Sequence, residues 1–167
     1  MVPAPDHYLI ALGSNMRSHR HGRPADVIAV ALELIAITGV EVVAASPVFR
    51  SRPLGPSQRE YANAAALVRS GLQPPALMRL LHGVEATLGR KRRGRRWQAR
   101  VCDCDIVLWG GGEWEDEGVI IPHPDYRWRE FVLRPAMTLV PGWRDPVTGH
   151  SIAQLFARLT RSHALTR

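Results

Sequence analysis

Apolar and polar residues follow one another along this chain in segments whose spacing predicts alternating strands and helices. Residues 8–12 form a short apolar run that ends in a Gly-Ser-Asn turn, which is typical of a buried strand. Apolar residues at helical spacing follow between Pro24 and Gly39, and again between Pro74 and Gly89. Proline suits the first turn of a helix and glycine the position after its end, so both segments are predicted to be amphipathic helices.

Strands are predicted where β-branched, aromatic or alternating apolar residues gather, at residues 40–50, 61–69 and 101–109. The tail is predicted to hold an acidic turn at 113–117, a short strand at 119–121, a proline-rich loop and a final amphipathic helix near 152–159. The order strand, helix, strand, strand, helix, strand is that of an α+β, ferredoxin-like β-α-β-β-α-β sandwich with a C-terminal extension. A length of 167 residues suits a single domain spanning residues 1–167.

Composition predicts a soluble protein. The chain is 46% hydrophobic and 22% charged, it begins with no cationic leader, and no stretch reaches the roughly 18 apolar residues of a membrane span. We therefore expect a cytoplasmic protein with no membrane partner. Cys102 and Cys104 are spaced i, i+2, a poor geometry for a disulfide, and are expected to be small, buried, reduced side chains.

The positive charge is concentrated in one loop. Of 22 Lys and Arg residues, seven fall within residues 90–100, which contain no acidic residue. The remaining 15 cations balance the 15 acidic residues of the chain, so the sequence lacks the general basic surface of a nucleic-acid-binding domain. No nucleic-acid partner is expected. A run of like charges is also the usual composition of a solvated surface loop.

Two carboxylates follow the basic loop directly. Asp103 and Asp105 are spaced i, i+2 on the predicted strand 101–109, so their side chains should share one face, about 6 to 7 Å apart at the backbone. Carboxylates combined with substrate phosphates are the usual ligands of Mg²⁺. The pattern indicates phosphoryl-type transfer from a nucleotide, although the chain contains no Walker-type glycine loop and no protein-kinase motif set.

Several motifs together carry a family resemblance. They are LGSN from residue 12, FRSRPLGP from 49, YANAA from 61, RRWQARVCDCDIVLWG from 95 and IPHPDYRWREFVLRP from 121. In this order the chain resembles the 6-hydroxymethyl-7,8-dihydropterin pyrophosphokinases of folate biosynthesis, over residues 8 to about 154. The most specific part is the Arg-x-x-Asp-x-Asp pattern of Arg100, Asp103 and Asp105.

The resemblance implies an ATP-dependent enzyme that moves pyrophosphate from ATP to the hydroxymethyl group of 6-hydroxymethyl-7,8-dihydropterin and releases AMP. The protein is expected to be a monomer. It implies that Asp103 and Asp105 bind two Mg²⁺ ions and that Arg92 and Arg100 are catalytic phosphate contacts. The implied nucleotide contacts are Glu85, Arg90, Arg96, Trp97, Ile106, His123 and Arg129. The implied pterin contacts are Ser51, Leu54, Tyr61, Asn63 and Phe131.

The chain departs from the family's pattern at several positions. Gln98 and Ala99 stand where the family commonly has Gly-Pro, and Arg52 stands where a smaller or acidic residue is usual.

Two other functions fit part of the sequence. A non-catalytic RNA-binding domain of ferredoxin-like fold would explain the basic loop, but the paired aspartates would repel phosphates without a metal. A metal-dependent nuclease uses similar carboxylates, but it would be expected to carry further acidic ligands nearby.

Overall fold

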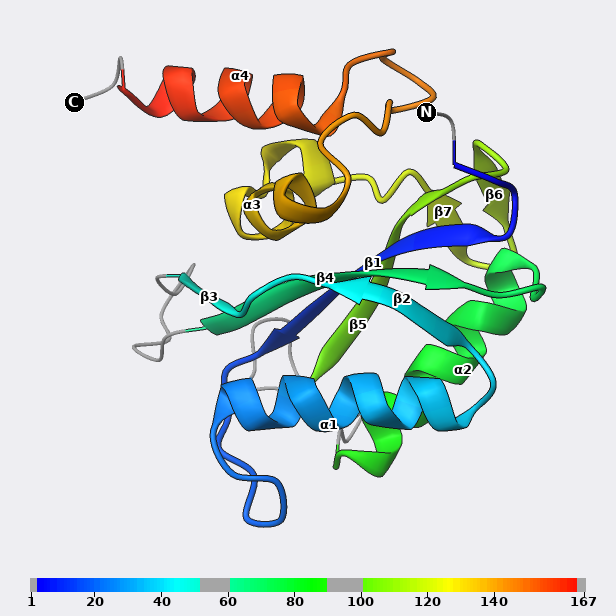
Figure 1. Ribbon diagram of the computed structural model, residues 1–167, viewed down its shortest axis with the longest axis vertical. Coiled ribbons are helices and arrows are strands. Elements are labelled where there is room, and N and C mark those ends of the chain that lie inside the picture. The colour runs from blue at the N-terminus through cyan, green and yellow to red at the C-terminus, as the bar shows by residue number, and fades with distance from the viewer. Residues whose placement is uncertain (1–2, 52–60, 90–100, 165–167) are drawn as a thin grey trace.

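The computed structural model describes residues 3–51, 61–89 and 101–164, which are built around one antiparallel sheet (Figure 1). Its strands are β1 (His7–Ser14), β2 (Glu41–Ala45), β3 (Phe49–Ser51), β4 (Tyr61–Arg69) and β5 (Asp103–Trp109). The strand order is β2-β4-β1-β5, and the short β3 pairs with one end of β4. This order, with β1 in the centre between β4 and β5, is the ferredoxin-like arrangement that the sequence predicted.

Helices α1 (Pro24–Ile37) and α2 (Pro74–Thr87) cover one face of the sheet (Figure 1). Both begin with proline in the first turn, and a glycine with positive φ follows each of them closely, as the spacing predicted. Their apolar residues pack with alternate residues of the strands into one core, which we call the inner core. It includes Ile10, Ile28, Leu81, Cys104 and Ile106.

The C-terminal part of the chain covers the opposite face of the sheet (Figure 1). A hairpin of β6 (Trp114–Asp116) and β7 (Val119–Ile121) leads to the 3₁₀ turn η1 (Tyr126–Trp128), α3 (Glu130–Leu139) and α4 (Ile152–Ala164). Buried residues of these elements form a second core with the other set of strand residues, among them Leu9, Ala65, Val107 and Leu133. The extension therefore adds a third layer to the two-layer sandwich.

Three predictions from the sequence were wrong in detail. Residues 40–50 form two strands, because Pro47 has no N–H for the ladder and the Ser46 hydroxyl accepts the N–H of Ala65 at 3.0 Å. Residues 114–116 form β6, paired with β7, where an acidic turn was predicted. Residues 130–139 form helix α3, where a proline-rich loop was predicted. Pro135 lies inside this helix, a position that proline usually disfavours.

A buried ion pair between Arg127 and Asp145 links two segments of the C-terminal extension. The carboxylate of Asp145, which is 0% exposed, accepts hydrogen bonds from Nε and Nη2 of Arg127, the latter at 2.9 Å. It also accepts the backbone N–H of Val147 at 2.9 Å. Burial alone would raise the pKa of Asp145, but these hydrogen bonds outweigh it and lower the pKa to about 2. Asp145 thus ties η1 to the chain that leads into α4.

Within residues 3–51, 61–89 and 101–164, no helix has both the length and the apolar character needed to cross a membrane.

Candidate active site

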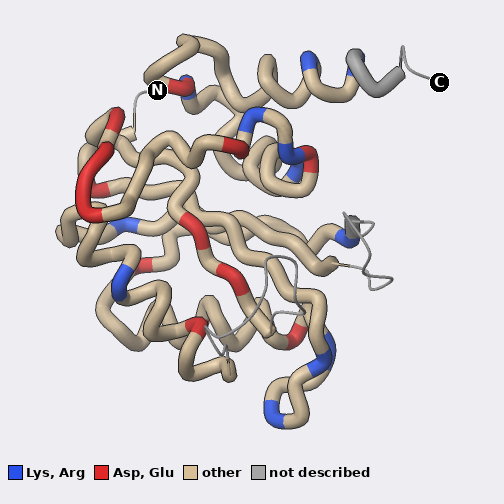
Figure 2. The backbone as a smooth tube through the Cα atoms, turned by 180° about the vertical axis from the view of Figure 1, so that it is seen from behind, with Lys and Arg blue, Asp and Glu red and all other residues tan. Residues whose placement is uncertain are grey.

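The two aspartates of β5 share one face of the sheet, as the sequence predicted. Cys102 and Cys104 are fully buried in the inner core, whereas Asp103 and Asp105 alternate with them and are partly exposed. Both cysteines are free thiols, with their sulfur atoms 3.8 Å apart. The carboxylates therefore lie on the face that α3 and α4 cover farther along the sheet, and Figure 2 shows acidic positions at successive points of this strand.

A row of paired residues crosses the sheet beside these carboxylates, and we call the strip of sheet surface over Asn63, Gly13 and Asp103 the trough. In the strand register, Asn63 of β4 lies opposite Gly13 of β1, and Gly13 lies opposite Asp103 of β5. Directly paired residues of antiparallel strands project from the same face, so Gly13 places no side chain between Asn63 and Asp103. Oδ1 of Asn63 lies 3.4 Å from the position that a Cβ at Gly13 would take. In the next row of the sheet Ala65 and Ala11 adjoin Asp105, so the side chains in register with this carboxylate are small as well.

Sequence reasoning did not select two of the residues that shape this trough. Phe49 of β3 lies opposite Asn63 and is partly exposed, so its ring extends the row at the far side. Gly13 was predicted to be part of a turn, but it belongs to β1 and pairs with both neighbouring strands. The period-two spacing of strand residues could have placed Phe49 on the Asn63 face, but only after the pairing of β3 with β4 was known.

Glu85 of α2 holds β5 in place from the opposite face. Its side chain is 1% exposed, and Oε1 accepts the backbone N–H of Cys104, between the two aspartates, at 2.8 Å. The hydrogen bond with Cys102, and then burial, raise the pKa of Cys104 well above its usual range, and the nearby Glu85 charge acts in the same direction. The cysteine therefore stays a neutral thiol beside the carboxylates.

His123 approaches the aspartates from the loop after β7. Its backbone N–H donates to the carbonyl of Val107, two residues beyond Asp105, at 3.0 Å. The backbone N–H of Asp125 donates to Nδ1 of the ring at 3.1 Å, so the neutral imidazole carries its proton on Nε2. Burial lowers the pKa of His123 below its ordinary value, although the charge of Asp105 acts to raise it.

These contacts predict how His123 titrates. We expect a neutral ring with an Nε2 proton at pH 7, since burial disfavours the imidazolium form. Asp105→Asn should lower the pKa of His123 further, because it removes the charge that favours protonation. Long-range ¹H–¹⁵N NMR of the imidazole across pH 4 to 8 measures both the tautomer and the pKa. A pKa above about 6.5, the value of a free histidine, would contradict this account of the ring's surroundings.

Arg129 lies at the start of α3, next to His123. Its Nη2 donates to Asp125 Oδ2 at 2.8 Å, and its guanidinium lies 5.8 Å from the centre of the Phe131 ring. Its positive charge also acts to lower the pKa of His123. Four of the predicted site residues are thus related: the charges of Asp105 and Arg129 both act on the pKa of His123, and Arg129 lies over the ring of Phe131.

The other predicted site residues are placed differently. The side chain of Ile106 belongs to the inner core, and that of Asn63 is 4% exposed. Tyr61 is partly exposed at the first position of β4, opposite Ser51 in β3. The remaining positions lie outside the described residues: Leu54, Arg90, Arg92, Arg96, Trp97 and Arg100.

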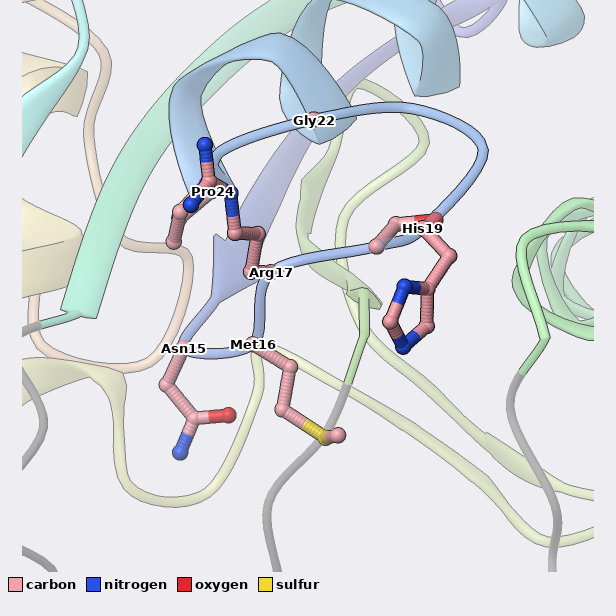
Figure 3. A pocket seen from close by; sticks show the side chains of 7 residues that line it. Asn15, Met16, Arg17, His19, Gly22 and Pro24 are labelled. Atoms are coloured by element: carbon pink, nitrogen blue, oxygen red, sulfur yellow. The ribbon is translucent and has the colours of Figure 1, made fainter.

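A hollow borders the same end of the sheet (Figure 3). It is lined by the loop between β1 and α1, by residues Asn15, Met16, Arg17, Ser18, His19, Gly22 and Pro24. Asn15 follows two residues after Gly13, the register partner of Asp103. The hollow therefore lies beyond the carboxylate end of the trough.

The donor set fits magnesium better than a softer metal. Among the residues that the structure describes, no group of three or more His, Cys, Asp and Glu side chains could hold a metal by itself. Two partly exposed carboxylates on one strand are instead the arrangement that suits Mg²⁺, which commonly completes its shell with water and substrate phosphates. Both cysteine thiols point into the core and are not available as ligands on this face.

Comparison with known proteins identifies the family. The model of the family described as 7,8-dihydro-6-hydroxymethylpterin-pyrophosphokinase (HPPK) matches residues 9–141. The chain belongs to this family. The family resemblance drawn from the motifs is thereby confirmed, and the matched HPPK region contains the trough, both aspartates, His123 and Arg129.

Two relatives illustrate how far the HPPK similarity extends. The chain is 37% identical over 127 residues to a 2-amino-4-hydroxy-6-hydroxymethyldihydropteridine pyrophosphokinase of Synechocystis, which covers 76% of this chain and 65% of the relative. It is 35% identical over 155 residues to the protein of the same description from Methylorubrum extorquens, with 92% and 93% of the two chains covered.

Solved structures share the HPPK fold. A crystal structure of an HPPK-DHPS in complex with substrates superimposes with a TM-score of 0.76 at 9% identity, over 98% of this chain and 45% of that one. The wild-type HPPK-DHPS of Plasmodium falciparum gives a TM-score of 0.72 at 11% identity, over 96% and 45%. This chain thus spans less than half the length of both of these structures, and the likeness to them concerns the fold.

Proposed function

We propose that this chain transfers the pyrophosphoryl group of ATP to the hydroxymethyl group of 6-hydroxymethyl-7,8-dihydropterin and releases AMP, as a step of folate biosynthesis. Family membership supports this reaction. The observation that carries it is the placement of Asp103 and Asp105 on one face of β5, in register through Gly13 of β1 with Asn63 of β4.

In the proposed reaction, the hydroxymethyl oxygen attacks the β-phosphorus of ATP. A bond forms between that oxygen and the β-phosphorus, the bond from the β-phosphorus to the oxygen bridging to the α-phosphate breaks, AMP leaves, and the hydroxyl proton passes to water. Bound Mg²⁺ would neutralise charge on the attacking and leaving oxygens. The protein needs no covalent intermediate, because its task is positioning and electrostatic stabilisation.

Asp103 and Asp105 would hold two Mg²⁺ ions together with the phosphates, and Glu85 would keep their strand in register through the N–H of Cys104. His123, neutral and with its proton on Nε2, would donate a hydrogen bond to a phosphate oxygen. Arg129, whose guanidinium lies close to His123 and Phe131, would add positive charge on the same side.

The trough would take the pterin. The Asn63 amide can both donate to and accept from the edge of a pterin ring, and the partly buried Phe131 can contact its face. Tyr61 shares the face of Asn63, two residues away on β4. Gly13 places no side chain of its own between the amide and the carboxylates.

A bulky side chain at position 13, within the trough, should weaken pterin binding. A Cβ at Gly13 would already lie 3.4 Å from Asn63 Oδ1, so the branched side chain of Gly13→Val would extend into the trough. We expect the KM for the pterin to rise about tenfold or more, and the KM for ATP to change less. Steady-state kinetics with each substrate varied in turn would measure both. Gly71→Val is the matched control, because a Cβ there meets nothing within 4 Å. Equal KM values for the pterin in the two variants would contradict the placement of the substrate.

Calorimetry separates the proposed function from the RNA-binding alternative. The purified protein would be titrated with α,β-methylene-ATP and Mg²⁺, then with 6-hydroxymethylpterin, and in parallel with a single-stranded RNA. We expect Mg²⁺-dependent binding of the nucleotide and binding of the pterin to the nucleotide complex. Binding of RNA, with no heat from either small molecule, would favour the alternative.

A further inference from the structure

A second group of basic residues lies in the loop between β1 and α1, apart from the site residues described above. No acidic residue occurs between Asp6 and Asp26. The basic side chains within this interval, apart from His7, all fall in residues 17–23, which we call the basic hairpin: Arg17, His19, Arg20, His21 and Arg23. Figure 2 shows its basic positions on the loop that projects at one end of the molecule.

The basic hairpin has a defined backbone. Ser18 and Gly22 exchange two backbone hydrogen bonds of 2.8 and 2.9 Å. The Ser18 hydroxyl accepts the N–H groups of Arg20 and His21 at 3.3 and 3.2 Å, which closes the turn. These bonds limit the conformations open to the segment, so that its side chains leave the loop from fixed points.

The basic hairpin borders the carboxylate end of the trough. Gly13 pairs with Asp103, and the chain continues from Gly13 through Asn15 directly into the hollow that Arg17 and His19 line. Figure 3 shows Arg17 beside Pro24 and His19 farther along the same loop. Arg20, at the turn, does not line the hollow.

The charges of the basic hairpin are not neutralised by the described carboxylates. Within the part of the chain that the structure describes, Arg17, Arg20 and Arg23 form no ion pair. The nearest acidic residue in sequence, Asp26, instead accepts the backbone N–H of Arg23 at 2.8 Å at the start of α1. Because that carboxylate compensates the positive end of the helix, an anion here would be held mainly by side chains.

We propose that the basic hairpin is a second phosphate-binding wall of the active site, in which Arg17 and His19 contact the polyphosphate of the nucleotide. This inference rests on the proposed function, since it assumes that Asp103 and Asp105 receive a nucleotide polyphosphate. An arginine and an imidazole at the rim of a hollow are suited to phosphate oxygens, and arginine can bind two of them at once. The hairpin thus adds cations on the β1 side of the carboxylates.

The test compares two ligands and three variants. Dissociation constants for α,β-methylene-ATP and for AMP, both with Mg²⁺, would be measured for the wild type, Arg17→Ala, Arg20→Ala and Arg161→Ala. We expect Arg17→Ala to weaken binding of the ATP analogue about tenfold, as for the loss of one charged hydrogen bond, and to leave AMP binding within about twofold. Arg20→Ala removes an equal charge outside the hollow and should cost less than about threefold, through the general field alone. Arg161→Ala, on α4, should have no effect.

Three outcomes would overturn the inference: unchanged affinity of Arg17→Ala for the ATP analogue, an equal loss for AMP, or an equal loss in Arg20→Ala. The formation of AMP from ATP and the pterin by the wild type is measured separately. Turnover by the wild type combined with unchanged binding by Arg17→Ala would refute the role of the hairpin alone. A wild type that binds the analogue through Arg17 but forms no AMP would refute the proposed reaction alone.

Discussion

Asp105→Ala should abolish Mg²⁺-dependent AMP formation while the protein remains folded. The side chain is partly exposed on the trough face, so its removal leaves no cavity in either core. Loss of a single preorganised electrostatic contact to a reacting group commonly lowers kcat by about 10²- to 10³-fold, and a shared metal ligand should cost at least as much. AMP release is measured by chromatography, and folding by circular dichroism and thermal unfolding.

Cys104→Ala is the neighbouring control for this prediction. Its side chain is fully buried in the inner core, on the opposite face of β5 from Asp105. We expect a loss of about 1 kcal/mol of stability from the small cavity, with turnover close to that of the wild type. The claim that Asp105 binds the catalytic Mg²⁺ would be contradicted if Asp105→Ala kept near-native turnover, or if both variants lost activity to the same degree.

Asp145→Ala should produce the largest loss of stability among the variants considered. It leaves the Arg127 guanidinium, whose side chain is only 20% exposed, without its carboxylate and removes the acceptor of the Val147 N–H. Breaking a buried ion pair by removing one partner costs about 3 to 5 kcal/mol. At about 2 to 4 °C per kcal/mol for a chain of this size, Tm should fall by roughly 6 °C or more. Differential scanning calorimetry at pH 7 measures this shift.

The pH dependence distinguishes the charge of Asp145 from its packing. A pKa lowered to about 2, against about 3.9 in an unfolded chain, means that the ionised carboxylate stabilises the fold above about pH 4 and that this contribution is lost as the pH falls toward 2. The difference in unfolding free energy between the wild type and Asp145→Asn should therefore narrow below about pH 4. A difference that stayed constant from pH 7 to pH 3 in urea unfolding would show that the charge is not what stabilises this region.

Periodicity predicted the central fold because its helices and strands bury regular apolar faces. The glycines and prolines at the ends of α1 and α2 marked their limits, and the strand predicted at residues 61–69 matched β4. The extension was harder to predict. Helix α3 contains Pro135, which is unfavourable inside a helix and made a loop the expected structure. The helix is stabilised because Val132, Leu133 and Ala136 pack on the sheet, and such tertiary contacts leave little signal in a short stretch of sequence.

The candidate site was predictable to the extent that its chemistry is local in sequence. Asp103 and Asp105 could be assigned to one face because strand side chains alternate. The contact of Glu85 with the N–H of Cys104 joins α2 to β5, and the Asn63–Gly13–Asp103 row joins three strands. Both depend on register between distant segments, which a single sequence does not specify. The motif resemblance supplied the roles of these residues, and the structure supplied their neighbours.

The most direct test of the central claim is the identity of the phosphorylated products. The purified wild type would be incubated with ATP, Mg²⁺ and 6-hydroxymethyl-7,8-dihydropterin, and the mixture followed by ³¹P NMR and mass spectrometry. The account predicts one AMP for each pterin consumed and a pterin that carries an intact diphosphate, with neither product formed when Mg²⁺ is chelated. Formation of ADP with a pterin monophosphate, or conversion of ATP that does not depend on the pterin, would contradict it.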